Sequence, residues 1–310
     1  MNLWVANQPF ILAGAIVLLG YLIRRLGVLS ADDGEALARI ALNITLPAVI
    51  LLNVPLVPIH LRDIALPLTS FASSALMATL AYHFFSKMKE GRGLAITASA
   101  GYNIGLFAIP LAGGLFGAEG IARFAFIDLG NAFAVFGLAY WLAGKTSPKV
   151  PEGQTFGPKA TMKMLLSSLP FLSYLLAIGM NLTGLKAQGF PLQVLTIFAH
   201  MNKGASLLVL GLLLQFNVPK KILKTVLPAL TLRYALGFTL ALGVLFLTPF
   251  PLLDRMTLAG TLIMPVGLSI IPFAVRWGHE RDTAAAMLYL GIPCSFILFW
   301  SIWLIGNTWG

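Results

Sequence analysis

Three ionisable side chains of this sequence stand in the middle of long apolar stretches: Asp128, Lys203 and Arg233. A charge inside a lipid bilayer is expensive, so an ionisable side chain in this position needs compensation. The charge of Lys203 must be compensated by a buried carboxylate or by an anionic substrate. Otherwise the amine is neutral and can relay protons. One carboxylate against two bases leaves a positive charge that suits an anionic substrate, unless Lys203 is neutral. We predict that Lys203 binds substrate and that Asp128 and Lys203 couple transport to an ion or a proton.

Glycine and proline interrupt two further apolar stretches at corresponding points. Asn103, Gly105 and Pro110 lie in the first stretch, and Pro265 and Ser269 lie in the second. Proline removes a backbone donor, so a helix broken in mid-membrane needs polar partners for its freed backbone groups, from a cavity, an ion or a substrate. Half-helices that begin after these prolines would direct their positive ends toward an anion. We predict these five residues to be substrate-binding. The alternatives are that the two polar side chains only satisfy freed backbone groups, and that Gly and Pro only kink the helices.

Asn43 stands four residues before Pro47 in another apolar stretch. It is predicted to line the substrate cavity, with hydrogen bonding to freed backbone carbonyls as an equal alternative.

No catalytic residue, metal site or bound cofactor is predicted. The single cysteine, Cys294, excludes a disulfide framework and a cysteine-based metal site. The tripeptide Gly144-Lys145-Thr146 lacks the first glycine of a P-loop, and there is no nucleophile-elbow motif. We therefore expect no enzyme activity, and any uphill transport must be driven by a gradient.

Composition identifies the elements that must position these residues. The chain has 310 residues, of which 58% are hydrophobic and 10% charged, with a mean hydropathy of +0.87. Such a chain is an all-α integral membrane protein, and it divides into about ten spans of about 30 residues each with their connections. A window of about 19 residues places them near residues 8–26, 36–56, 63–86, 94–117, 120–144, 163–182, 190–216, 220–248, 256–277 and 282–305.

The basic residues segregate to one set of connections. If the connections alternate in side, 15 of the 21 Lys and Arg lie on one side, 4 on the other and 2 inside spans. Basic residues near short spans resist translocation, so both termini are expected outside a multi-pass protein of the cell membrane. The net charge of +10 thus reports topology in the lipid bilayer, and no nucleic-acid partner is predicted.

A segment rich in Pro, Gly and Lys separates two groups of five spans. The predicted domains are a first repeat at residues 1–145, a cytoplasmic linker at 146–162 and a second repeat at 163–310. Because five is odd, a second structural repeat would be inverted in the membrane, which is typical of secondary transporters.

Motifs spread along the chain resemble the auxin efflux carrier family, which includes bacterial permeases for small carboxylates. The opening motif, the second span, the fourth span and the ninth span carry the resemblance, in Gly20-Tyr21-Leu22-Ile23-Arg24-Arg25-Leu26-Gly27, Asn43-Ile44-Thr45-Leu46-Pro47-Ala48, Asn103-Ile104-Gly105-Leu106-Phe107-Ala108-Ile109-Pro110 with Gly117, and Met264-Pro265 with Ala274 and Arg276-Trp277-Gly278. The chain departs from the family pattern at Ala108, Ser269, Pro272 and Trp277.

The resemblance implies ten helices in two inverted five-helix repeats, with the broken helices 4 and 9 crossed at the site, as in bile-acid symporters and sodium/proton antiporters. It also implies a scaffold domain, a transport domain and, commonly, a homodimer. The leading hypothesis is a secondary active transporter of a small organic anion, a carboxylate or an auxin-like acid, that works by elevator-type alternating access with coupling to H⁺ or Na⁺. The alternatives are a cation/proton antiporter of the same fold and, in another class, an intramembrane lipid-modifying enzyme.

Overall fold

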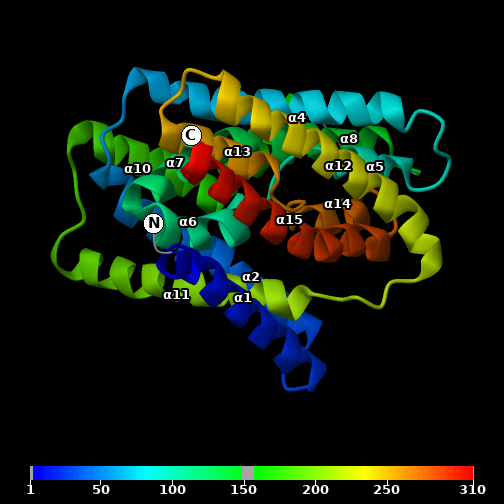
Figure 1. The fold of residues 1–310 in the computed structure, drawn as a ribbon, viewed down its shortest axis with the longest axis horizontal. Coiled ribbons are helices and arrows are strands. Elements are labelled where there is room, and N and C mark those ends of the chain that lie inside the picture. Colours follow the sequence, from blue (N-terminus) through cyan, green and yellow to red (C-terminus); the bar gives the residue numbers. More distant parts are fainter. Residues whose placement is uncertain (1–2, 149–156, 310) are drawn as a thin grey trace. The chain divides into compact units, whose positions relative to one another are not determined.

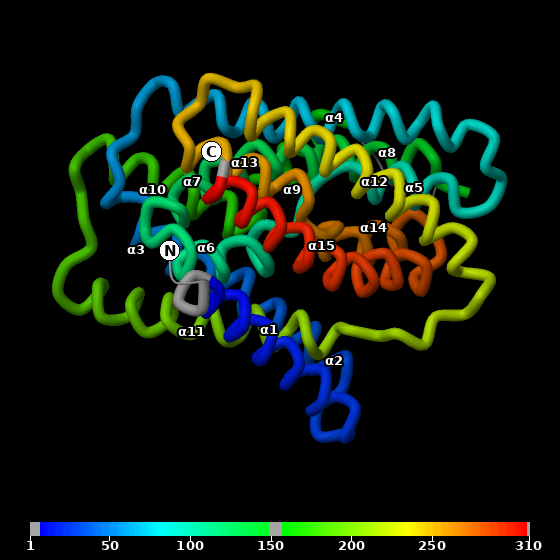
Figure 2. Tube along the Cα trace, viewed as in Figure 1, coloured from blue at the N-terminus to red at the C-terminus, as the bar shows by residue number. Residues whose placement is uncertain are grey.

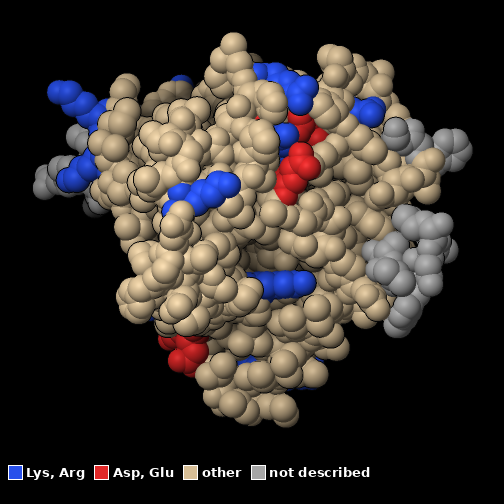
Figure 3. All heavy atoms as spheres, turned by 90° about the vertical axis from the view of Figure 1, so that its left-hand side faces the viewer, with Lys and Arg blue, Asp and Glu red and all other residues tan. Residues whose placement is uncertain are grey.

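The computed structural model describes the backbone of residues 3–148 and 157–309 and the side chains of 7–148 and 157–308. All regular structure in these ranges is helical (Figure 1), which confirms the all-helical class for the described residues. Within these ranges, seven helices are long and apolar enough to cross a membrane, or eight if the interrupted pair α9 (Pro158–Leu166) and α10 (Leu169–Thr183) counts as one span. Most of the surface seen in Figure 3 is neither acidic nor basic.

Besides the interrupted pair α9 and α10, which covers the expected span near 163–182, two of the ten expected spans, near 94–117 and 256–277, are not continuous helices. The first consists of α5 (Arg92–Thr97), a non-helical break, the π-helical η4 (Ile104–Ala108) and α6 (Ile109–Leu115). The second consists of α13 (Leu252–Leu262), a break and α14 (Ile270–Arg276). The broken character predicted from Gly and Pro is therefore present, while the count of ten spans and their inverted symmetry stay predictions.

The chain forms two compact units, and each unit takes segments from both sides of the predicted linker. Unit 1 contains residues 1–64, 104–128 and 166–214, and unit 2 contains residues 65–103, 129–165 and 215–310. The predicted linker at 146–162 lies partly outside the described residues, which omit 149–156. The predicted repeats at 1–145 and 163–310 concern internal symmetry along the chain. The division into compact units does not test this symmetry.

Unit 1 is built around the long helices α1 and α11, which run side by side (Figure 2). A Cβ added at Gly20 would lie 2.5 Å from the Leu208 carbonyl oxygen, and one at Gly211 would lie 2.1 Å from the Val17 carbonyl oxygen. Small residues at these points let the two backbones approach closely. The helical segments of unit 1 are α1 (Leu3–Arg25), α2 (Ala31–Ile40), η1 (Ala41–Thr45), α3 (Leu46–Asn53), η2 (Val54–Leu56), η3 (Leu61–Ile64), η4, α6, the first part of α7 (Gly117–Phe133), α10 and α11 (Gly189–Leu213).

Hydrogen bonds from polar side chains link the helices of unit 1, both at a helix end and in the interior. The Arg24 guanidinium donates to the carbonyls of Leu212 and Leu214 at 3.0 and 3.1 Å, where α11 ends. In the interior, the Asn202 amide donates to the Thr45 hydroxyl at 2.9 Å. These bonds satisfy groups that would otherwise be costly away from water.

Unit 2 is held by close helix contacts around α12. A Cβ added at Gly237 would lie 2.3 Å from the Leu262 carbonyl oxygen, so α12 packs tightly on α13. The Tyr234 hydroxyl lies 2.7 Å from both the Gly291 carbonyl and the Ser295 hydroxyl, which links α12 to α15. The helical segments of unit 2 are α4 (Ala65–Phe84), α5, the end of α7, the π-helical η5 (Ala134–Ala139), α8 (Tyr140–Lys145), most of α9, α12 (Lys220–Leu247), α13, α14 and α15 (Arg281–Trp309).

Candidate functional site

The first helix break, at residues 98–103, depends on a glycine. Gly101 has φ +83°, a left-handed conformation that side chains with a Cβ rarely adopt. A Cβ at this position would also lie only 2.6 Å from Cγ2 of Val135. Glycine is therefore required both by the turn and by the packing of η5 against it.

The second break, at residues 263–269, depends on a proline. Pro265 has no N–H to continue the ladder of α13, and the residue before a proline is disfavoured in the helical region. Ser269, a predicted site residue, immediately precedes α14 and is half-buried, and its backbone carbonyl accepts from the Phe273 N–H at 3.1 Å. Ser269 therefore marks the resumption of the helix after the break.

The two breaks meet in unit 2. The backbone N–H of Asn103 donates to the carbonyl of Pro265 at 3.0 Å, and Asn103 is buried. Two of the predicted substrate-binding residues, from distant parts of the sequence, are thus in direct contact.

A buried guanidinium joins both breaks. Arg233 on α12 is 1% exposed and donates to the carbonyls of Ala98 and Gly101 at 2.5 and 2.9 Å and to those of Met264 and Pro265 at 2.9 and 3.4 Å. None of the ion pairs among the described residues includes Arg233. Its positive charge is therefore surrounded by carbonyl dipoles and not neutralised by a carboxylate.

Asn131 on α7 forms hydrogen bonds with the backbone at the first break. Its side-chain oxygen accepts from the Tyr102 N–H, and its amide donates to the Tyr102 carbonyl, both at 2.8 Å. The Tyr102 ring in turn has the Arg233 guanidinium 5.3 Å from its centroid. Arg233 and Asn131 thus supply hydrogen-bond partners to backbone groups at the breaks.

Lys203 lines a cavity within unit 1. The cavity has a volume of about 620 Å³. Apart from Lys203, it is lined by Gln8, Pro9, Ile11, Leu12, Ala15 and Gly114. Within the described residues Lys203 has no ion-pair partner, and its ammonium lies 3.4 Å from the point that a Cβ on Gly114 would occupy. The cavity thus combines one cationic group and one amide with an apolar wall.

Asp128, the predicted coupling residue, lies on α7 and accepts a hydrogen bond from the Tyr174 hydroxyl of α10. Both residues belong to unit 1. This contact gives the carboxylate a donor within the protein, and the sequence analysis did not anticipate Tyr174.

The remaining predicted residues have local roles in unit 1. The Asn43 amide donates to the Arg39 carbonyl at 2.9 Å, one turn earlier in the chain. A Cβ at Gly105 would lie 2.7 Å from Cδ2 of Leu46, so this glycine serves close packing on α3. Pro110 is the second residue of α6, which continues directly from η4.

The predicted site residues therefore divide between the units. Asn103, Pro265 and Ser269 belong to unit 2, and Asn43, Gly105, Pro110, Asp128 and Lys203 belong to unit 1. Sequence analysis noted Arg233 as an intramembrane base without assigning it to the site, and it missed Asn131. The signal for both was the same: a polar side chain within an apolar stretch.

Two curated relatives cover much of the chain. A protein named as an uncharacterized transporter from Methanothermobacter thermautotrophicus is 24% identical over 301 residues, which are 93% of this chain and 94% of the relative. Another uncharacterized transporter, from Methanocaldococcus jannaschii, is 29% identical over 206 residues, 63% of each chain. No family model matches the chain. Together with the long apolar helices, these similarities indicate a multi-pass membrane protein.

Proposed function

We propose that this protein is a secondary active transporter of a small organic anion. The observation that carries the proposal is the buried Arg233, which holds the broken ends of two helices through four carbonyls without a carboxylate partner among the described residues. A fixed positive charge at paired helix breaks favours an anion over a cation, because paired broken helices are where transporters bind their substrates.

The cavity beside Lys203 supports an amphipathic anion. The Lys203 ammonium provides one strong contact for a carboxylate, while Ile11 and Leu12 offer an apolar surface for the rest of the ligand. A carboxylate or an auxin-like acid has this combination of one charged end and an apolar body. The names of the two relatives support transport in general, and the resemblance to the auxin efflux carrier family supports the anionic class.

Two compact units built from interleaved chain segments are compatible with alternating access of the elevator type, in which one unit moves relative to the other. We further propose coupling to H⁺ or Na⁺, a location in the cell membrane with both termini outside, and a homodimer. Each of these follows from the charge segregation or the family resemblance, not from a contact within this chain.

A second candidate, a cation/proton antiporter of the same fold, is favoured by Asp128. This carboxylate with its Tyr174 donor is the kind of group that binds and releases a proton during exchange. Another described carboxylate, Asp63, is already paired with Arg123 at 2.8 Å.

The proposal is tested by the thermal unfolding of detergent-purified protein against mono- and dicarboxylates, aromatic acids, sodium and pH. A ligand that binds only the folded state raises Tm by mass action. At a ligand concentration of 100 times Kd, the free energy of unfolding increases by about 2.7 kcal/mol. We expect a concentration-dependent shift with one carboxylate class that is lost in Lys203→Ala. Lys186→Ala, which removes an exposed lysine of unit 1, is the matched control and should keep the shift.

Asp128→Asn separates the two candidates. In proteoliposomes loaded with the carboxylate identified above, an anion carrier retains substrate binding in this variant even if coupling is impaired. The antiporter is indicated if no acid shifts Tm, and if sodium or pH produces a shift that Asp128→Asn abolishes. That second outcome overturns the anion proposal.

A further inference from the structure

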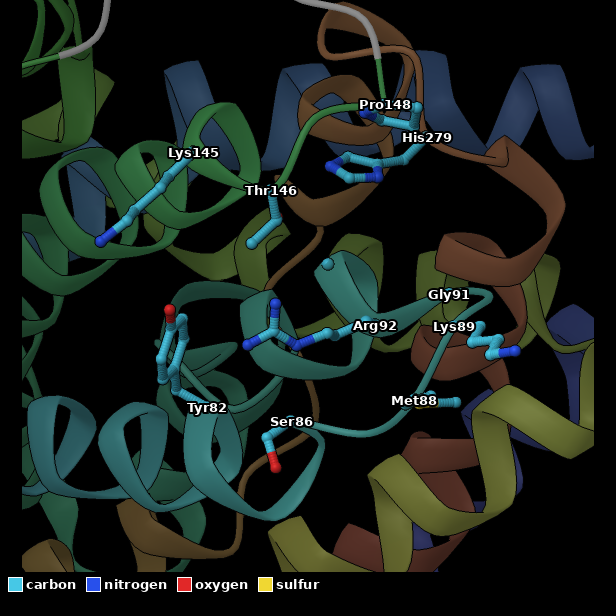
Figure 4. Close-up of a pocket in the computed structure, with 11 residues that line it drawn as sticks. Tyr82, Ser86, Met88, Lys89, Gly91, Arg92, Lys145, Thr146, Pro148 and His279 are labelled. Carbon is cyan, nitrogen blue, oxygen red and sulfur yellow. The ribbon is translucent and has the colours of Figure 1, made fainter.

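A second cavity, entirely within unit 2, lies at the ends of several helices and is distinct from the groups described above. Its volume is about 440 Å³. It is lined by the end of α4, the loop to α5, the end of α8 and the turn between α14 and α15 (Figure 4), with Tyr82, Ser86, Arg92, Lys145, Thr146 and His279 as its principal polar groups.

Two cations converge on one aromatic ring in this cavity. The Arg92 guanidinium carbon lies 4.7 Å from the centroid of the Tyr82 ring, and the Lys145 ammonium nitrogen lies 5.8 Å from it. In the view of Figure 4 the Arg92 guanidinium lies on one side of Tyr82 and the Lys145 ammonium on the other, whereas the ammonium of Lys89 points away from them. Like charges that share a small space repel each other, so an anion between them would be stabilised.

Among the described residues, no acidic side chain neutralises this pair. The cavity has no Asp or Glu in its lining, and none of the ion pairs within residues 7–148 and 157–308 includes Arg92 or Lys145. Glu280 is adjacent in sequence to His279, but its carboxylate accepts from the Thr283 hydroxyl at 2.5 Å at the start of α15. The positive charge therefore faces the cavity without an internal counter-ion.

The cationic groups are held in place before any ligand arrives. Arg92 donates from Nε to the Phe85 carbonyl at 3.1 Å, which leaves the outer guanidinium nitrogens for another partner. Lys145 also lies over the Trp141 ring, 4.6 Å from its centroid. A Cβ on Gly93 would lie 2.5 Å from both Cε1 of His279 and Oγ1 of Thr146, so glycine keeps this wall of the cavity close-packed. Preorganisation of this kind reduces the entropic cost of binding.

We propose that this cavity binds a phosphate group between Arg92 and Lys145. The planar guanidinium suits bidentate recognition of phosphate oxygens, and the ammonium adds a point charge. Ser86 and the Tyr82 hydroxyl are further donors in the lining. The helix ends around the cavity belong to the connections that charge segregation assigns to the cytoplasmic side, where basic pockets bind lipid headgroups. The phosphate comes either from an anionic lipid or from a soluble phosphate compound, and the site does not depend on the proposed transport activity.

The test measures the Tm of detergent-purified protein with three probes: inorganic phosphate, dioctanoyl phosphatidic acid and dioctanoylglycerol, which has the same acyl chains without phosphate. Lys145→Gln is the main variant, because the side chain is exposed and its removal should not prevent folding. Lys220→Gln, at the exposed start of α12 and outside the cavity lining, removes one charge as a matched control. Arg92→Lys keeps the charge but removes the planar fork.

We expect the two phosphate-containing probes to raise Tm, with affinity about tenfold weaker in Lys145→Gln and weakened in Arg92→Lys but unchanged in Lys220→Gln. A response to both probes identifies the phosphate group alone as sufficient, and a response to phosphatidic acid only identifies a lipid headgroup. The proposal is overturned if neither probe acts, if dioctanoylglycerol acts equally, or if Lys220→Gln loses as much affinity as Lys145→Gln.

Discussion

Arg233 brings a positive charge into the interior of unit 2, and four backbone carbonyls from two separate helix breaks surround it. The geometry of these contacts requires a planar group with several donors, because a single ammonium cannot reach carbonyls on both sides at once. Arg233 thus has a structural role, which is to hold the breaks together, and an electrostatic role, which is to leave the site positive.

Arg233→Lys separates these two roles. The charge is retained, but most of the carbonyl contacts are lost, so we expect the free energy of unfolding to fall by about 1.5–3 kcal/mol. Denaturant titration of the purified variant measures this change. Arg39→Lys, at an exposed position of α2, is the control and should be neutral; an Arg233→Lys protein as stable as wild type would contradict the structural role.

His279 links pH to stability outside the spans. Burial lowers its pKa, and its hydrogen bond with the Ala143 carbonyl, at 2.9 Å, only partly offsets this effect. The folded state therefore binds the proton less well than the unfolded state, whose histidine has a pKa of about 6.5. The stability that neutral His279 contributes is present above about pH 6.5 and is lost as the pH falls through the lowered value.

We accordingly expect Tm of the wild type to fall between about pH 7.5 and about pH 5.5 more than Tm of His279→Gln, in which the amide keeps a donor for Ala143 but has no titratable group. Carboxylates titrate in both proteins, so the difference between the two Tm curves isolates His279. Parallel curves over this range would show that the histidine does not contribute.

At the scale of elements, the sequence predicted the breaks near Gly101 and Pro265, because proline and glycine impose the interruption locally, but it did not predict the break between α9 and α10. Pro265 removes a donor and Gly101 adopts φ +83°, both of which depend on the residue type alone. The groups that repair the breaks were not predictable in the same way. Arg233 and Asn131 are distant in sequence from Gly101 and Pro265, and only the packing of α12 and α7 brings them to the site.

The contact between α1 and α11 provides a prediction about helix packing. Gly211→Ala would place a Cβ 2.1 Å from the Val17 carbonyl oxygen and 2.9 Å from the Gly20 Cα, so the helices must separate. We expect a loss of about 1–3 kcal/mol in the free energy of unfolding, measured by denaturation in mixed detergent micelles.

Gly204→Ala is the matched control on the same helix, since nothing lies within 4 Å of its added Cβ. Alanine is a better helix former than glycine, so this variant should be neutral or more stable by up to about 1 kcal/mol. Equal effects of the two substitutions would mean that helix propensity and not helix contact determines the outcome.

At the scale of the whole molecule, hydropathy and charge predicted a multi-pass helical membrane protein because both act on every segment independently. The two compact units could not be predicted in this way. Each unit combines segments from both halves of the chain, such as α1 with α11 in unit 1 and α4 with α12 in unit 2. Such pairings depend on tertiary contacts between helices of similar composition, and apolar periodicity does not distinguish one partner helix from another.

The placement of the termini is a prediction at this scale, because it depends on the parity of the spans and on the segregation of 15 basic residues to one side. Alkaline phosphatase, which is active only outside the cytoplasm, should be active when fused after Trp309, and a fluorescent protein that matures only inside should be bright when fused after Lys145. Exchanging the two reporters provides the control and should silence both. An active phosphatase after Lys145 would reverse the orientation and move the cavity of Arg92 and Lys145 to the outer side, whereas an inactive phosphatase after Trp309 would place the C-terminus inside.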